Sequence, residues 1–427
     1  MLKKISSTIG VKAITAIFAF LTLIITARIL GTEGRGIIGL FMATVSFAIM
    51  FNYLIGGSTL VYLSSRHPNN TLIWSSYIWA VFSNALAFVI ISLSNSSIAE
   101  YANHIFVISL LTSLFQINLN MLLGRENVLK YNLYSLLMVS LNFLLICLLF
   151  LILEWHSIES FIYSLYVSLA VCFILSLFAL KGSLDLKFDK NLWITGVTAM
   201  SFGFISQLAN ISQLLNLRLS FYLIEYYTFT ENVGVYSTGT TLTESIWMIA
   251  GSMALVQYAI VSNSRDRRES MEMSAKMARV SLILTLMALI PLLILPESFY
   301  TYIFGEGFRG IKNVIYALSP GVLSIGFSMA FSHYFAGVGN YKINAICSGS
   351  GLLVTLVCSL LMIPLWGIVG AGIASSIAYL FISFLLIVFF IKDTKISIGL
   401  LIPSTRDFEA LSVLKNKLLS FTRPPHH

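Results

Sequence analysis

Long apolar runs that contain almost no polar side chain dominate this sequence. One of them, LNFLLICLLFLILEW at 141–155, is continuously apolar and does not alternate between apolar and polar positions. A transmembrane helix needs about 20 predominantly apolar residues. A membrane β-strand instead needs about ten residues in alternation. The pattern therefore predicts an all-α integral membrane protein.

Twelve segments of the chain have the length and the hydropathy of a membrane-crossing helix. They are 9–30, 37–63, 72–93, 103–123, 132–153, 158–180, 193–223, 234–261, 276–296, 313–338, 344–363 and 368–391. The sequence therefore predicts twelve transmembrane helices.

The distribution of charge predicts which side of the membrane each link occupies. The chain is 57% hydrophobic and 10% charged, and its formal net charge is +8. Short links rich in Lys and Arg stay in the cytoplasm, and most basic links fall on one side if the N-terminus is cytoplasmic. Both termini are therefore predicted to be cytoplasmic, and the positive charge does not indicate a nucleic-acid partner. The outward basic exceptions are Arg35, Arg309 and Lys312.

A charged link, KGSLDLKFDKN, divides the predicted helices into two sets of six. The predicted parts are an N-terminal six-helix half (1–180), a cytoplasmic linker (181–192), a C-terminal six-helix half (193–391) and a cytoplasmic tail (392–427).

The two halves share one short repeat. TEGRGII at 32–38 follows the first predicted helix, and TENVGVY at 230–236 follows the seventh, each at an outward turn. Two six-helix repeats of the same topology are a common transporter plan, with the binding site at their interface. We therefore expect the two halves to surround a central cavity.

The stretch ARILGTEGRGIIG at 27–39 contains a GxGxxG pattern, formed by Gly34, Gly36 and Gly39. A dinucleotide fingerprint places this pattern between a strand and a helix, with an acidic residue about 20 positions later. Here the pattern lies between two predicted membrane helices, and the next acidic residue after Glu33 is Glu100. The glycines instead predict a tight turn and close helix packing.

Arg28 lies inside the apolar run of the first predicted helix. A charge there costs at least ~2.5 kcal/mol at the bilayer centre and less towards the interface. Two interpretations follow. The guanidinium extends to the headgroups of the outer leaflet, or it faces a water-filled cavity and binds an anion, for which its planar fork suits phosphate.

The seventh predicted helix carries a row of amides at three-residue spacing: Gln207, Asn210, Gln213 and Asn216. Such a row drifts slowly around a helix and makes a broad polar face, which we expect to be directed inward. The alternative is that the amides only hydrogen-bond to neighbouring helices.

Arg218 on the seventh helix and Glu244 on the eighth lie at depths that allow them to meet. A structural ion pair is one interpretation, and removal of one partner would then leave a buried unpaired charge. The other interpretation is a gate or a proton-sensitive element, because burial and a neighbouring arginine shift the pKa of a glutamate in opposite directions.

The sequence predicts neither a metal site nor a cofactor. The four cysteines are scattered without ligand spacing, and no two histidines have the spacing of metal ligands. No GxxxxGK[ST] motif occurs, so the chain encodes no Walker-type ATP site.

Four features of the chain resemble one family of membrane proteins. They are ARILGTEGRGIIG, LNLRLSFYLIEYYTFTENVGVYSTGTTLTESIWMIAGSM, FAGVGNYKINAICSGSGLLVTLVCSLLMIPLWGIVGAGIASSIAY and the twelve-helix layout. The chain resembles, over residues 1–391, the polysaccharide-lipid flippases of the O-antigen (Wzx) type, in the multidrug/oligosaccharidyl-lipid/polysaccharide exporter superfamily. The positions that match the family pattern are Arg28, Arg218, Gly234, Tyr236 and Glu244. Ser220 stands where the family usually has an aspartate, and Ala259 stands where a proline is common.

The resemblance implies a flippase of the bacterial cytoplasmic (inner) membrane, active in polysaccharide and lipopolysaccharide biosynthesis. Its substrate would be an undecaprenyl-diphosphate-linked oligosaccharide, moved from the inner to the outer leaflet by alternating access. Arg28 and Arg218 would bind the diphosphate, and the four amides of the seventh helix would bind sugar or line the cavity. The implied partners are the polysaccharide polymerase and the chain-length regulator.

Two other functions compete with this interpretation. An ion-coupled multidrug exporter of the related branch would favour an acidic cavity. The charged residues placed deep in the predicted helices here are two arginines and one glutamate. A membrane glycan polymerase would commonly carry a sizeable outward loop, and the longest outward link here is 296–312. The chain is therefore not expected to be an enzyme.

Overall fold

The computed structural model describes residues 2–57, 60–61, 64, 69–94, 96–125, 127–181, 192–264 and 266–404. These residues form helices and short connections, and no strand occurs among them. Eight helices in this part of the chain are long and apolar enough to cross a membrane. The predicted all-α membrane fold is confirmed, whereas the count of twelve crossings stays a prediction. Most of the predicted linker and of the predicted tail lies outside the described residues.

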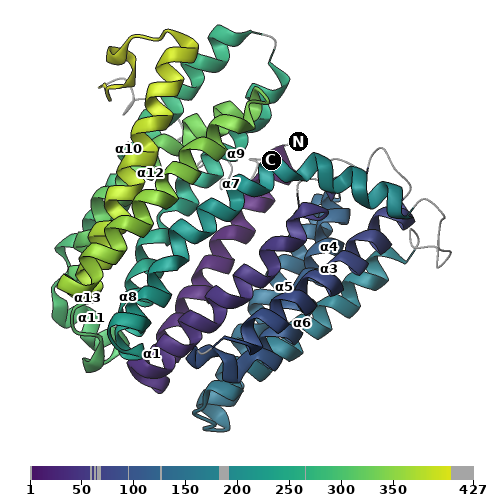
Figure 1. The fold of residues 1–427 in the computed structure, drawn as a ribbon, viewed down its shortest axis with the longest axis vertical. Coiled ribbons are helices and arrows are strands. Elements are labelled where there is room, and N and C mark those ends of the chain that lie inside the picture. The colour runs from purple at the N-terminus through teal and green to yellow at the C-terminus, as the bar shows by residue number, and fades with distance from the viewer. Residues whose placement is uncertain are drawn as a thin grey trace, which may run out of the picture. The chain divides into compact units, whose positions relative to one another are not determined.

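The chain forms two compact units, and each is described by itself. The first unit comprises Met1–Thr238 and Pro296–Ile311. Its helices are α1 (Leu2–Met50), η1 (Phe51–Leu54), α3 (Asn69–Ser92), η2 (Ser97–Tyr101), α4 (Ala102–Gly124), α5 (Val128–Cys147), η3 (Leu148–Ile152), α6 (Ile158–Leu180), α7 (Leu192–Tyr227), α11 (Glu297–Phe304) and η4 (Glu306–Phe308). Within this unit α1, α4, α5 and α6 pack against one another, and α3 packs against α4 and α7 (Figure 1).

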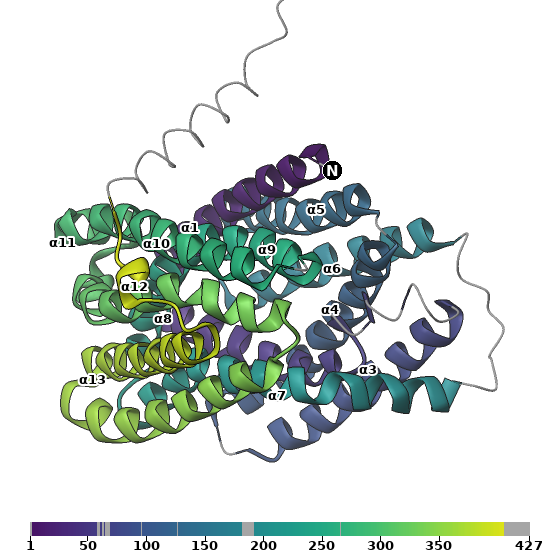
Figure 2. The same cartoon turned by 90° about the horizontal axis from the view of Figure 1, so that it is seen from above.

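The second unit comprises Gly239–Leu295 and Lys312–His427. Its helices are α9 (Trp247–Asn263), α10 (Arg267–Ile294), α12 (Ile311–Gly337), α13 (Tyr341–Thr394) and η5 (Ile398–Leu401), which the second view also shows (Figure 2). Helix α8 (Thr230–Ser245) contributes residues to both units.

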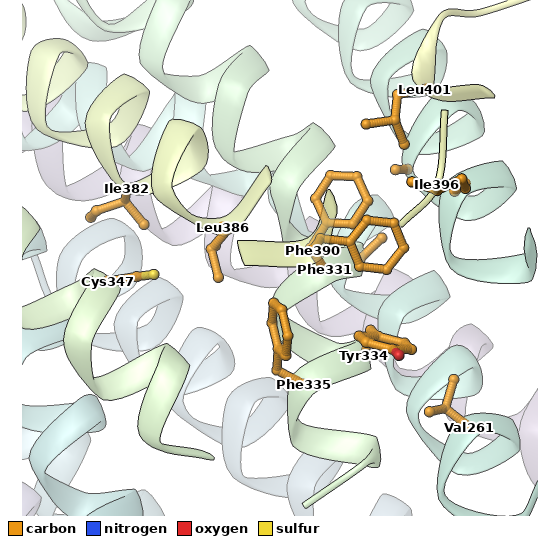
Figure 3. Packing of buried hydrophobic residues seen from close by; sticks show 13 residues of the cluster. Val261, Phe331, Tyr334, Phe335, Cys347, Ile382, Leu386, Phe390, Ile396 and Leu401 are labelled. Atoms are coloured by element: carbon orange, nitrogen blue, oxygen red, sulfur yellow. The ribbon is translucent and has the colours of Figure 1, made fainter. Parts of the chain in front are cut away.

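Aromatic packing stabilises the core of the second unit. Figure 3 shows Phe331, Tyr334 and Phe335 of α12 gathered beside Phe390 of α13. The ring centroids of Phe331 and Phe390 are 4.5 Å apart, and those of Tyr334 and Phe390 are 5.0 Å apart. Leu401 of η5 belongs to the same cluster, so the segment after α13 folds back onto the core.

Glycines break the two longest helices. Gly31 in α1 has φ +67° and Gly367 in α13 has φ +55°, both in the left-handed region that favours glycine. The 49 and 54 residues of these helices would extend about 75 Å and about 80 Å if straight, more than twice the ~30 Å of a bilayer core. Both breaks lie between predicted crossings, so the chain turns where the sequence predicts.

The segment predicted as one eighth helix, 234–261, is two helices, α8 and α9, which meet at Ile246. The hydroxyls of Thr238 and Thr243 donate to the carbonyls of Gly234 and Gly239, four residues earlier. Such side-chain bonds to the preceding turn often bend helices. No glycine or proline at Ile246 marks this break in the sequence.

Candidate functional site

The two copies of the sequence repeat lie against each other in the first unit. Thr32 in one copy corresponds to Thr230 in the other, and Gly36 corresponds to Gly234. A Cβ atom on Gly36 would lie 2.0 Å from the carbonyl oxygen of Thr230, and one on Gly234 would lie 1.9 Å from that of Thr32. Each glycine therefore packs directly on the backbone of the other copy.

These contacts are reciprocal, as in an isologous two-fold interface. Gly39 and Ser237 hold the same position in the two copies and also meet, because a Cβ on Gly39 would lie 3.0 Å from Ser237 Oγ. We call segments 32–39 and 230–237 the α1–α8 crossing, and it has local two-fold pseudo-symmetry. The predicted packing role of the GxGxxG glycines is confirmed for Gly36 and Gly39.

Arg28 binds backbone carbonyls at the end of α11. Its Nε donates to the carbonyl oxygen of Ile303 at 2.9 Å, and a second guanidinium nitrogen donates to that of Tyr302. The guanidinium carbon also lies 5.7 Å from the centre of the Tyr302 ring. Carbonyls in the last turn of a helix lack intrahelical partners and attract cations. Arg28 therefore fastens α11 to α1, although its side chain is exposed.

The segment that contains α11 closes on itself. The backbone N–H of Gly310 donates to Glu297 Oε1 at 2.7 Å, and Arg309 pairs with Glu306 at 2.8 Å. A Cβ atom on Gly307 would lie 3.2 Å from Thr32 Cγ2, so the segment also contacts the α1–α8 crossing. The outward link of the sequence analysis is therefore an ordered helical hairpin.

The four amides of α7 do not share one environment. Gln207 and Asn216 are buried, whereas Asn210 and Gln213 are exposed. Three-residue steps rotate about 60° each, so the ends of the row point to opposite sides of the helix. Gln207 Nε2 donates to the carbonyl of Met50 at 2.7 Å, a hydrogen bond to the end of α1. Asn210 and Gln213, the exposed pair, make no such hydrogen bond to the end of α1.

Arg218 is half-buried on α7, with its guanidinium carbon 5.3 Å from the centre of the Phe221 ring. Glu244 is half-buried on the part of α8 that belongs to the second unit. The pairing of these two residues stays a prediction. Ser220, which stands at the position of the family's aspartate, is buried, and its Oγ makes no hydrogen bond.

Arg35 has a setting that the sequence analysis missed. The sequence assigned it to an outward turn, but it lies on α1 beyond the break at Gly31. Its Nε is buried and has no hydrogen-bond partner. The available signal was its place in the repeat, because TEGRGII has an arginine where TENVGVY has Val233.

Within the described ranges, no three His, Cys, Asp or Glu side chains gather in a way that could hold a metal ion. The four cysteines are free.

The fold is that of a class of membrane transporters. The chain is similar to the lipid II flippase MurJ in its inward closed conformation, with 12% identity, a TM-score of 0.72, and coverage of 100% of this chain and 94% of that one. It is also similar to an inward-facing multidrug resistance MATE family transporter of the MOP superfamily, with 13% identity, a TM-score of 0.70, and coverage of 92% and 98%.

A third similar structure is a MOP superfamily transporter from Pyrococcus furiosus, described as having a binding pocket of reverse polarity (13% identity, TM-score 0.67, coverage 92% and 96%). No protein-family model matches the sequence, and no curated protein matches it. The chain is thus a multi-pass membrane protein with the fold of MOP superfamily transporters, and these neighbours are transporters and a flippase, not enzymes.

Proposed function

We propose that the chain is a flippase for a lipid-linked oligosaccharide. Its substrate is an undecaprenyl-diphosphate-linked O-antigen or capsule repeat unit, which it moves from the inner to the outer leaflet of the bacterial cytoplasmic membrane. The observation that supports this most is the chemistry of α7, which presents half-buried Arg218 together with exposed Asn210 and Gln213.

The substrate needs these groups because its head cannot cross hydrocarbon unaided. Transfer of unpaired hydroxyls into an apolar medium costs several kcal/mol each, and charged phosphates cost far more. Arg218 supplies a guanidinium fork for the diphosphate, and Arg28 supplies positive charge from its place at the end of α11. Asn210 and Gln213 supply donors and acceptors for sugar hydroxyls. The lipid tail stays in the bilayer while the head crosses.

Alternating access by the two six-helix halves, 1–180 and 193–391, would expose this site to each side in turn. The fold shared with the lipid II flippase MurJ supports a lipid-linked substrate. The polysaccharide polymerase and the chain-length regulator would use the product at the outer leaflet.

The second candidate is an ion-coupled multidrug exporter, favoured by the fold shared with a multidrug resistance MATE family transporter. Cationic drugs would favour acidic side chains in the site. The deep charges on which the proposal rests are instead Arg28 and Arg218 against Glu244. We therefore rank the flippase first, and a membrane glycan polymerase after the exporter.

The test is complementation in a bacterium that lacks its own flippase. The intact chain should restore surface glycan, and Arg218→Ala should abolish export at equal abundance in the membrane. Arg309→Ala is the control, because it also removes one arginine, but an exposed one that pairs with Glu306 in the α11 hairpin. Full export by Arg218→Ala would refute the diphosphate role. Failure of the intact chain combined with increased resistance to cationic drugs would favour the exporter.

A further inference from the structure

We propose that Arg35 binds an anionic phosphate group beside the α1–α8 crossing, in a site built by the first unit. The inference rests on the proposed function for its choice of phosphate, and it adds a residue that neither the amide row nor the resemblance indicated. Three observations on the described residues support it.

The first observation is the missing partner of the guanidinium. Arg35 Nε is shielded from solvent and makes no hydrogen bond, and no ion pair involves this residue in the described part of the chain. Glu33, the nearest carboxylate in the sequence, and Glu231, which holds the same position in the second repeat, are both exposed. The residue as a whole is half-buried, so Nε is the shielded donor that lacks an acceptor. A buried donor left without an acceptor is unfavourable, and a bound anion would supply one.

The second observation is the pseudo-symmetry of the crossing. Position four of the repeat is Arg35 on α1 and Val233 on α8. Val233 is fully buried, and its Cγ1 lies 3.8 Å from the place of a Cβ on Gly39. The two-fold relation maps this contact onto Arg35 and Ser237. An environment that holds a valine on one side of the axis therefore holds an arginine on the other, so packing alone does not explain the cation.

The third observation is the tightness of the crossing around this position. Gly36 and Gly39 bring the α8 backbone and Ser237 into contact with α1 one and four residues after Arg35. Arg35 itself is only half-buried, so part of its side chain is open to a ligand. A phosphate oxygen suits this approach, because the planar fork binds it with two parallel hydrogen bonds.

Two sources could supply this phosphate: a lipid-linked diphosphate or a free or phospholipid phosphate. The test uses the purified full chain in neutral detergent and measures its melting temperature with four probes. Farnesyl diphosphate carries lipid and diphosphate, farnesol carries lipid only, pyrophosphate carries no lipid, and phosphatidylglycerol carries a single phosphodiester. A ligand that binds only the native state raises the melting temperature.

The decisive variant is Arg35→Val, which installs the residue found at the equivalent position of α8. Without ligand it should melt at or above the wild-type temperature, since it removes an unpartnered charge and adds a side chain that this environment accepts. Its affinity for farnesyl diphosphate should fall about 10- to 100-fold, the loss expected for one charged hydrogen-bonding group. Arg309→Val is the matched control and should keep the wild-type affinity.

Two results would overturn the proposal. One is a clearly lower melting temperature of unliganded Arg35→Val, with the same loss in Arg35→Gln, because the arginine would then have a structural partner. The other is equal stabilisation of wild type and Arg35→Val by every phosphate probe. Pyrophosphate or phosphatidylglycerol stabilises the wild type as strongly as farnesyl diphosphate does if the site binds a free or phospholipid phosphate. That result would assign the site to these simpler phosphates. Because these are binding measurements, failed complementation would refute the flippase and leave the Arg35 site standing.

Discussion

Arg28 hydrogen-bonds to the C-terminal end of α11, a role that its position in the sequence did not indicate. Its partners, the carbonyls of Tyr302 and Ile303, lie 274 and 275 residues later in the chain. Neither the headgroup interpretation nor the diphosphate interpretation included them. Patterns within a helix show that a charge needs a partner, but they do not identify a partner that tertiary packing brings from so far away.

The capping geometry predicts what a change at Arg28 does. Arg28→Ala should loosen the hairpin 296–311, because a cation at a helix C-terminus contributes about 0.3–1 kcal/mol when exposed. Arg28→Lys should keep most of this contribution, since the charge remains. Hydrogen exchange of the backbone amides in 297–308 measures the effect, with Arg268→Ala as the control, because Arg268 is an exposed arginine that pairs with Glu272 on α10, outside the hairpin. Unchanged exchange in Arg28→Ala would contradict the capping role.

The amides of α7 illustrate how far residue patterns can be used. The sequence indicated correctly that the row lies along one long helix, α7. It did not separate Gln207, which hydrogen-bonds to Met50 of α1, from the exposed Asn210 and Gln213. That division depends on which helices pack against α7, information that lies in no single helix.

At the scale of elements, glycine positions were the most informative part of the sequence. Gly31 and Gly367 lie in the gaps between apolar runs, so the breaks of α1 and α13 could be predicted. The break between α8 and α9 at Ile246 could not, because neither a glycine nor a proline lies at it. The repeat was noticed as sequence similarity, but only coordinates show that its two copies contact each other reciprocally.

The α1–α8 crossing makes a symmetric prediction. Gly36→Ala and Gly234→Ala should destabilise the protein by similar amounts, because each new Cβ would lie about 2 Å from a carbonyl oxygen of the opposite copy. Overpacking of this kind costs about 1–3 kcal/mol. Gly10→Ala is the control, since a Cβ there meets no atom within 4 Å. It should be neutral or stabilising, because alanine favours helix over glycine by about 1 kcal/mol.

Thermal unfolding of the three variants in detergent checks this prediction. A clear loss in only one of Gly36→Ala and Gly234→Ala would contradict the local two-fold symmetry. If both variants have the same melting temperature as the Gly10→Ala control, the helices separate easily and the crossing is not a tight contact.

At the scale of the whole molecule, hydropathy determined the fold class, because lipid imposes long apolar helices on any chain of this kind. The substrate has no comparable pattern. Structural neighbours at 12–13% identity share this fold and include both a lipid II flippase and a multidrug resistance transporter. The choice between them depends on a few charged and polar side chains, whose arrangement follows from packing rather than from hydropathy.

The last prediction concerns which side of the membrane each helix end occupies. Helix α13 allows the clearest test of it. If the break at Gly367 joins two crossings, Trp366 lies on the outward side, while Lys342 and Lys392 both lie in the cytoplasm. All three side chains are exposed. In a variant without native cysteines, Trp366→Cys should react with a membrane-impermeant maleimide in intact cells, and Lys342→Cys and Lys392→Cys should react only after lysis. Labelling of Lys342→Cys and Lys392→Cys from opposite sides would mean that α13 crosses once, and the chain would then have fewer than twelve crossings.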